Sequence, residues 1–522
     1  MRTIYLALIT ILCFTLLFTG CAKKSDTSST SSSSSGDSEF LSAMPGNLAI
    51  SSNTASGSSV SSRTLGRTAQ AVSDATDPVN QSDKVTRLQA VLKATSLDEC
   101  HKAIPKTMKY SGGNYVDCYG PELAYVNHPG SGSGSLPTGD LGIWTAYNDN
   151  TTQEACAAGQ MNLLMKKTSK KVDLAMGISA MMVCAAKNDG LSLPAVGATA
   201  LDVTTSLNKT DMEDERGGMS ITSATLQRSS LTSGDTLWTS TLAGSFTATG
   251  DASSQSFSIT LKHVPTTEGT TVSTTGEGLI QMYQTGLSES DWNCGGSTLG
   301  LANSVLYKNT SDNLSFRAIR AKFASTITDA SNFYESDGEV SKQNKNDNST
   351  NGWCADYNVV VANVDSSGFG KVSYAWQAGP GDGYTRTFNI RTDNNSADNQ
   401  TGDAYFGFNP SPDDSSGSDD YRSTSIDRMI CNWAGPGAPA TANKTGVSKM
   451  QRQQLEYDST NYVWKSATDN ITFAPTNDCD FTSNSSTTFG GSSASITNNL
   501  VDNSTYTTNF GSQPSAPTVT LE

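Results

Sequence analysis

The chain of 522 residues carries little positive charge for its size. Lys and Arg number 35 against 50 Asp and Glu, which gives a formal net charge of −15. Nucleic-acid phosphates are bound by concentrated Lys and Arg, so this balance argues against a nucleic-acid partner. Hydrophobic residues make up only 35 %, yet counting the 45 glycines brings the apolar share to about 43 %, near the usual ~45–50 %. A wholly disordered chain is therefore not expected.

Histidine is scarce as well. The chain holds only His101, His128 and His263, and none belongs to an H-E-x-x-H zinc motif. No G-x-S-x-G nucleophile elbow occurs, because the serines of residues 130–134 are out of phase with that turn. We therefore interpret the protein as non-catalytic. A tethered hydrolase is an alternative that would need a cleft in which distant acids or a histidine converge.

Motifs for metal ions are also missing. The cysteines include no C-x-x-C pair, which argues against structural zinc. We interpret the acidic residues 393–403 and 413–420 as loops with oxygen ligands suited to calcium, although neither has the spacing of an EF-hand. The acidic run at residues 211–215 is interpreted as a solvated loop rather than a catalytic pair. We predict no cofactor, with calcium as the alternative.

Long hydrophobic runs are absent beyond the first two dozen residues. Residues 4–18 form an apolar run after Arg2, and its length of about 15 residues is too short for the ~20 that span a bilayer as a helix. No later stretch approaches ~18 apolar residues. Residues 1–20 are therefore predicted to be a signal peptide.

The signal ends in the sequence Leu-Phe-Thr-Gly-Cys at residues 17–21, which resembles the lipobox of bacterial lipoproteins. Gly20 and Cys21 match that pattern, whereas Phe18 stands where the family usually has Leu. The resemblance implies that Cys21 becomes the mature N-terminus, carries acyl chains and anchors the protein in a lipid bilayer. Ala22, where the family's inner-membrane members have Asp, implies the outer membrane of a bacterium, on its periplasmic or its outer side.

Residues 21–83 are predicted to form a disordered tether. Ser, Thr, Gly and Ala dominate this segment, so it cannot bury enough surface to offset its ordering entropy. About 60 flexible residues have an r.m.s. span of roughly 45 Å. Such a tether would lift the folded part clear of the lipid headgroups.

The periodicity of the rest changes near residue 200. Residues 84–200 are predicted to be a helical, disulfide-containing subdomain, with helical spacing over residues 84–100 and 152–187. Residues 201–522 alternate with a period of two in about a dozen short segments separated by Asn, Asp, Gly and Ser. The expected fold class is α+β, mainly β: a small helical N-terminal part followed by a large antiparallel β-sandwich or barrel-like meander.

Eight cysteines remain when Cys13 and Cys21 are set aside, an even number that an exported chain would use for disulfides. These candidates are Cys100, Cys118, Cys156, Cys184, Cys294, Cys354, Cys431 and Cys479. Four lie in the helical part and four in the β part, so we expect two bridges in each. The simplest pairing in the helical part joins Cys100 to Cys118 and Cys156 to Cys184, although spacing alone does not choose among the pairings.

Two further patterns bear on partners. Four lysines at residues 166–171 form a basic patch that we interpret as a solvated helix face, with anionic lipid or an acidic protein as alternatives. Trp292, Trp353 and Trp433 lie close to cysteines and are interpreted as core residues. If they were exposed in a row, the protein would be a carbohydrate-binding module. The sequence thus favours a lipid-anchored protein for binding, adhesion or envelope structure, whose protein or glycan partner it does not identify.

Overall fold

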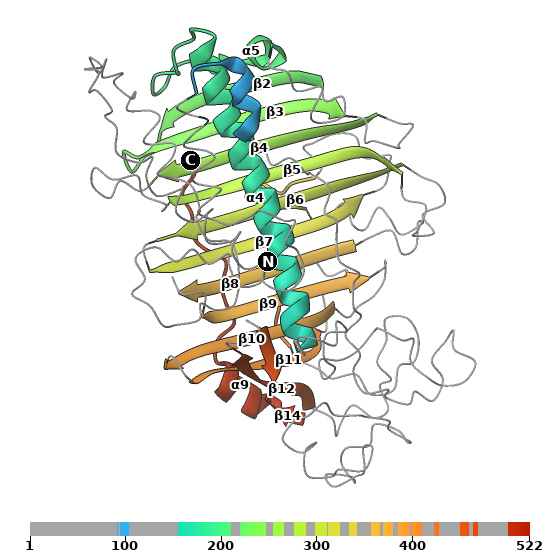
Figure 1. The fold of residues 1–522 in the computed structure, drawn as a ribbon. Coiled ribbons are helices and arrows are strands. Elements are labelled where there is room, and N and C mark those ends of the chain that lie inside the picture. The colour runs from blue at the N-terminus through green and yellow to red at the C-terminus, as the bar shows by residue number, and fades with distance from the viewer. Residues whose placement is uncertain are drawn as a thin grey trace, which may run out of the picture.

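The computed structural model describes residues 91, 94–103, 155–209, 220–246, 254–265, 276–288, 298–310, 312–323, 333–341, 356–365, 369–378, 385–396, 399–409, 422–426, 449–458, 463–467 and 500–522. These residues form an α+β fold that is mainly β, as the sequence predicts (Figure 1). The helices are the 3-10 helix η1 (Leu97–Ala103), α4 (Cys156–Asn188), α5 (Thr204–Asn208) and α9 (Asn503–Phe510).

All the strands belong to one antiparallel sheet. They are β1 (Leu201–Asp202), β2 (Ser220–Ser230), β3 (Thr236–Phe246), β4 (Gln255–Pro265), β5 (Gly276–Ser288), β6 (Thr298–Asn309), β7 (Asn313–Phe323), β8 (Asp356–Asp365), β9 (Gly370–Ala378), β10 (Thr385–Ser396), β11 (Asn399–Asn409), β12 (Lys449–Asp458), β13 (Val463–Ser466) and β14 (Leu500–Asp502). Each strand from β1 to β13 pairs with the next one along the chain, and β14 pairs with β12. The sheet is thus an open meander.

Helix α4 crosses one face of this sheet from end to end (Figure 1). Near its start, the Ala155 N–H donates to the Trp464 carbonyl of β13 at 2.7 Å, and its later turns contact β2, β3 and β4. A helix of 33 residues is about 50 Å long, and eleven spacings of ~4.8 Å between β2 and β13 amount to about 53 Å. The helix is therefore long enough to cover the whole width of the sheet. We call the side it covers the helix face.

The second half of α4 is apolar on all sides, which predicts burial all round. Residues 175–186 are all buried, Met176, Met181 and Met182 among them, so these methionines are core residues. Ser179 is also buried there, and its hydroxyl lies 2.5 Å from that of Ser240 on β3. The helix ends where the sequence indicates, at Asn188, and Gly190 takes a left-handed φ of 77° just beyond it.

On the opposite side, called here the far face, the described residues include three separate pieces of chain that cover the sheet. Residues 333–341 pack through Phe333 and Val340 on β6, β7 and β8. Residues 422–426 contribute Ile426 to a cluster with α9, whose Tyr506 and Phe510 pack against Tyr405 of β11. Residues 511–522 then continue from α9 along the sheet, and the chain ends beside β4 (Figure 1). The sheet therefore has an apolar layer on both sides.

Close packing on the helix face depends on Gly278 of β5. A Cβ atom at this position would lie 2.6 Å from the hydroxyl oxygen of Tyr307, which is fully buried on β6, and closer still to the Lys262 main-chain carbonyl oxygen of β4. At Gly300, also in a strand, the nearest atoms to such a Cβ are those of Phe333 at 3.6 Å, an ordinary contact.

The two glycines should therefore differ in their tolerance of alanine. Gly278→Ala is expected to lower the free energy of unfolding by about 1–3 kcal/mol, because Tyr307 must move in a close-packed region. Gly300→Ala should change it by less than about 0.5 kcal/mol. Urea unfolding of both variants measures the difference, and equal stabilities would contradict this packing.

Candidate functional site

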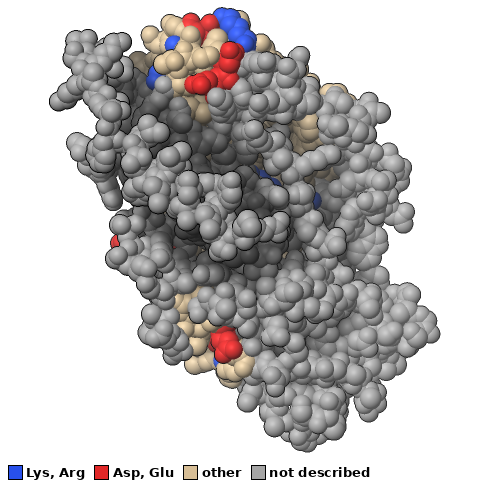
Figure 2. All heavy atoms as spheres, in the orientation of Figure 1, with Lys and Arg blue, Asp and Glu red and all other residues tan. Residues whose placement is uncertain are grey.

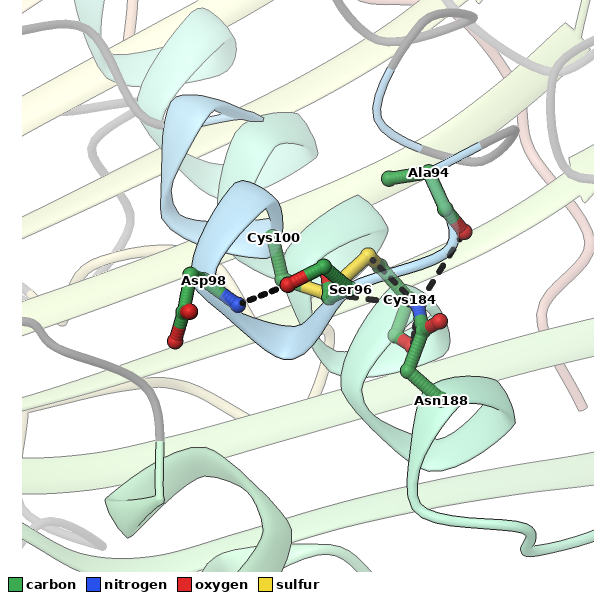
Figure 3. The surroundings of a disulfide bond; sticks show 6 residues. All are labelled: Ala94, Ser96, Asp98, Cys100, Cys184 and Asn188. Atoms are coloured by element: carbon green, nitrogen blue, oxygen red, sulfur yellow. Dashed lines mark hydrogen bonds between the residues drawn. A yellow bond between two sulfur atoms is a disulfide. The ribbon is translucent and has the colours of Figure 1, made fainter.

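A disulfide joins η1 to the last turns of α4 (Figure 3). Cys100 and Cys184 are both buried, and their Cα atoms are 5.5 Å apart. The side-chain amide of Asn188 donates to the Ala94 carbonyl at 3.2 Å and to the Cys184 carbonyl at 3.0 Å, which ties the segment before η1 to the helix. The bridge thus holds the start of the described chain at the C-terminal end of α4.

This bridge corrects the predicted pairing. The expectation that Cys100 pairs with Cys118 and Cys156 with Cys184 is wrong, because Cys100 is bonded to Cys184. Cys156 and Cys184 stand near opposite ends of one continuous helix. At 1.5 Å per residue, about 42 Å separates them, far beyond the ~7 Å limit for a disulfide. The helix predicted over residues 152–187 already contains both cysteines, so this pairing is inconsistent with the predicted helix.

Most other residues singled out in the sequence lie outside the described residues. They are Cys21, Cys118, Cys294, Cys354, Cys431, Cys479, His128, Trp292, Trp353, Trp433 and residues 130–134, 211–215 and 413–420. In the basic patch, only the side chain of Lys171 is described. It is partly buried and donates to the Asn303 side-chain oxygen on β6, so Lys171 at least does not belong to a solvated helix face.

Of the acidic residues 393–403, those that the structure describes lie in strands and not in a loop. Residues 393–396 form the end of β10 and residues 399–403 the start of β11, where Asp393 and Asp403 lie beside arginines. Arg391 donates to Asp393 at 3.0 Å, and Arg452 donates to Asp403 at 2.8 Å. Both carboxylates are thus partly neutralised. Among the described residues, no group of three or more His, Cys, Asp or Glu side chains is placed to hold a metal ion.

An aromatic row runs across β2, β3 and β4 on the helix face. The Arg228 guanidinium lies 4.6 Å from the Trp238 ring centroid, and the Trp238 and His263 rings are parallel with centroids 6.5 Å apart. His263 is fully buried, and this burial lowers the pKa of its imidazole from 6.5 to about 3. The ring is therefore neutral at neutral pH, and we assign it to the core.

A buried carboxylate fastens residues 333–341 to the far face. Glu339 is 1 % exposed and accepts hydrogen bonds from Arg317 Nε of β7 at 2.7 Å and from Arg422 Nη1 at 2.8 Å. Arg422 also pairs with Asp337, and this ion pair, opposed by burial, lowers the pKa of the Asp337 carboxyl. These charges neutralise one another and fix the covering segment in place.

A polar row crosses β9 to β5 on the far face. Its members are cross-strand partners at one level of the sheet: Lys371, Asn363, Ser315, Lys308 and Glu277. Lys308 and Glu277 form an ion pair with 2.6 Å between Nζ and Oε2. Residues 511–522 lie along this polar row, which offers donors to main-chain carbonyls and one acceptor to a main-chain N–H.

Charged side chains of both signs also gather at the α5 end of the molecule (Figure 2). Lys209 and Asp189 form an ion pair there, with 2.5 Å between Nζ and Oδ1. The hydrogen bonds from Lys209 and Ser206 lower the pKa of the Asp189 carboxyl. This group joins α5 to the end of α4, so we assign it a structural role.

Comparisons with known proteins identify no relative: no family model, no curated protein and no solved structure matches the chain. None of the helices within the described ranges has the length and apolar character needed to cross a membrane. The arrangement of side chains is therefore the basis for any functional conclusion about the folded part.

His263 makes acid sensitivity a testable property of the helix face. Between pH 6.5 and about 3 the unfolded chain binds a proton at this imidazole and the folded chain does not. This residue alone should therefore lower the free energy of unfolding by about 1.4 kcal/mol for each pH unit below 6.5. His263→Phe keeps an aromatic ring beside Trp238 but cannot bind a proton. In urea unfolding at pH 7, 6 and 5, the wild type should lose stability relative to this variant as the pH falls; parallel profiles would rule the effect out.

Proposed function

We propose that this chain is a non-catalytic lipoprotein of a bacterial outer membrane. In this proposal Cys21 carries the acyl chains, residues 22–83 form the tether, and the folded sheet is a binding or structural module held near the lipid surface. Two or more acyl chains, at about 0.8 kcal/mol per buried methylene, give stable anchoring without a membrane-spanning helix. The lipobox-like sequence at residues 17–21 supports the anchor.

The observation that carries the proposal is the buried disulfide between Cys100 and Cys184. Disulfides persist in exported proteins and are rare where thiols are kept reduced, so this bridge agrees with the signal peptide expected from residues 1–20. It also lies at the first described part of the chain after the tether. A pull on the tether would therefore reach α4 directly.

The paired charges of the described residues support a non-catalytic module. Glu339, Asp393 and Asp403 each accept hydrogen bonds from arginines, so these carboxylates are held as ion pairs. General acid or base catalysis needs a group that can exchange a proton with a substrate. Binding through the main-chain contacts of the polar row needs no such group.

Metabolic labelling with palmitate tests the anchor. Wild-type chain should incorporate the label and fractionate with membranes, whereas Cys21→Ala should lose both properties because the acceptor thiol is gone. Cys13→Ala is the matched control, since Cys13 lies within the signal that processing removes, and it should label like the wild type. Equal labelling of Cys21→Ala and wild type would refute the lipoprotein assignment.

The disulfide is tested separately by its contribution to stability. The two cysteines are 84 residues apart in the sequence, and in the chain-entropy model closing a loop of that length stabilises the fold by about 4.6 kcal/mol. The double variant Cys100→Ser, Cys184→Ser should lose stability of that order in urea unfolding. Dithiothreitol should destabilise the wild type more than the double variant; if it affects both equally, this bridge is not formed in the native protein.

A further inference from the structure

Residues 511–522, called here the C-terminal segment, lie across the strands instead of pairing with one of them. At one end the Lys371 ammonium donates to the Ser512 carbonyl at 2.9 Å, and the Ser373 hydroxyl donates to the Gln513 side-chain oxygen at 3.0 Å. Towards the other end the Thr520 N–H donates to Glu277 Oε1 at 3.0 Å. The segment therefore spans the polar row from β9 to β5.

The middle of the C-terminal segment is held by Asn363 of β8. When its side-chain amide is assigned the orientation that satisfies both its oxygen and its nitrogen, the nitrogen donates to the Ser515 carbonyl at 3.3 Å and to the hydroxyl of Ser315 on β7 at 2.9 Å. The second bond orients the amide within the sheet, just as the ion pair with Lys308 orients Glu277. The polar row is thus a set of side chains positioned by their own neighbours.

Three of the contacts, those of Lys371, Asn363 and Glu277, go to main-chain atoms of the C-terminal segment. Contacts with main-chain atoms select an extended backbone and do not depend on a particular side chain. Extended peptides gain affinity from main-chain hydrogen bonds in other recognition modes as well. The sequence of the occupant must then be read by its buried side chains.

Those buried side chains are prolines. Pro514 and Pro517 are buried, while Ser515, Thr518 and Thr520 are exposed, so the two buried positions have a spacing of three residues. This is the period of a polyproline II helix, whose three-residue repeat rises about 9.3 Å. The Ser512 and Ser515 carbonyls contact the neighbouring strands β9 and β8, and the Thr520 N–H contacts β5. Eight residues thus cross four strand spacings, about 19 Å, which is within the ~25 Å that a polyproline II chain of that length spans, so a Pro-x-x-Pro segment is long enough to lie across these strands.

From this geometry we propose that the polar row is a recognition site for extended peptides with Pro-x-x-Pro spacing, and that residues 511–522 are its resident occupant. A proline-bearing segment of a partner protein would bind the site by displacing the resident segment. The proposal concerns the far face alone and does not depend on acylation of Cys21.

The junction with α9 suits such an exchange. Gly511 has a left-handed φ of 72°, so the C-terminal segment turns away from the helix at a single residue. Helix α9 is docked by ring contacts of Tyr506 and Phe510 with Tyr405, and the Tyr506 hydroxyl also accepts a hydrogen bond from the Gln513 side chain of the C-terminal segment. Release of the segment would therefore break this hydrogen bond and leave the ring contacts of α9 in place.

The proposal is tested with a fluorescent peptide of residues 511–522 and the full chain. In the released variant, Pro514→Ser, Pro517→Ser and Leu521→Ser weaken the resident segment at positions outside the strands. Fluorescence anisotropy should show saturable binding of the peptide to the released variant. The wild type should bind the peptide at least roughly tenfold more weakly than the released variant does, because its intact resident segment competes at an effective concentration in the millimolar range. A peptide with both prolines changed to serine should bind roughly tenfold more weakly than the native peptide.

Site variants in the released background complete the test. Lys371→Ala and Asn363→Ala should each weaken peptide binding severalfold, whereas Lys262→Ala, a lysine on β4 of the same face, should leave it unchanged. A wild-type chain with a protease site inserted after Gly511, cut after folding, should also exchange its segment for the labelled peptide. Circular dichroism confirms that each protein is folded. The proposal is overturned if neither the released nor the cut chain binds the peptide at ~1 mM, or if the proline-free peptide binds equally well.

Discussion

The span of α4 across the sheet is the constraint on which the structure depends. In a meander each strand pairs only with its neighbours in sequence, so no strand pairing connects the two edges of the sheet. Without covering elements, both faces of such a sheet would be exposed to solvent. Thirty-three residues of helix match the width from β2 to β13, so one element contacts strands near both edges of the sheet, from β2, β3 and β4 to β10 and β13. This arrangement requires a helix whose second half is apolar on all sides, and residues 175–186 are accordingly all buried.

Two cross-strand rows, one residue apart in each strand, give the sheet its opposite faces. Trp238, His263 and Tyr307 lie on the helix face, and the neighbouring polar row lies on the far face. Because side chains alternate along a strand, a slip of one residue in any pairing would exchange a buried ring for a charge. The register is therefore fixed by burial on one side and by the C-terminal segment on the other.

The sequence predicted the fold class and most strands, because strict alternation survives in β3 to β12. It missed β2, where a bulge between Ile221 and Ser223 shifts the alternation, so that burial falls on Ile221, Ala224 and Leu226. It also missed α9, whose Thr- and Asn-rich sequence has low helix propensity and is held by Tyr506 and Phe510. The polar row could not be read at all, since its members lie on five strands and become neighbours only through register. The disulfide partner of Cys100 could not be read either, because the packing of η1 on the last turns of α4 is a contact between segments 84 residues apart in the sequence.

The two elements that cross the strands also explain how a lipid-anchored module of this shape could bear load. Under the proposed anchoring, the tether enters at η1, and the disulfide transfers its pull to the end of α4 that lies over β2 to β4. Because α4 packs on several strands, the force would be shared among its contacts with them and would not act on a single strand pair. The C-terminal segment crosses the other face and adds few contacts of its own. A partner that displaced the C-terminal segment would therefore change the exposed surface of the far face. The contacts through which α4 carries the force would stay in place.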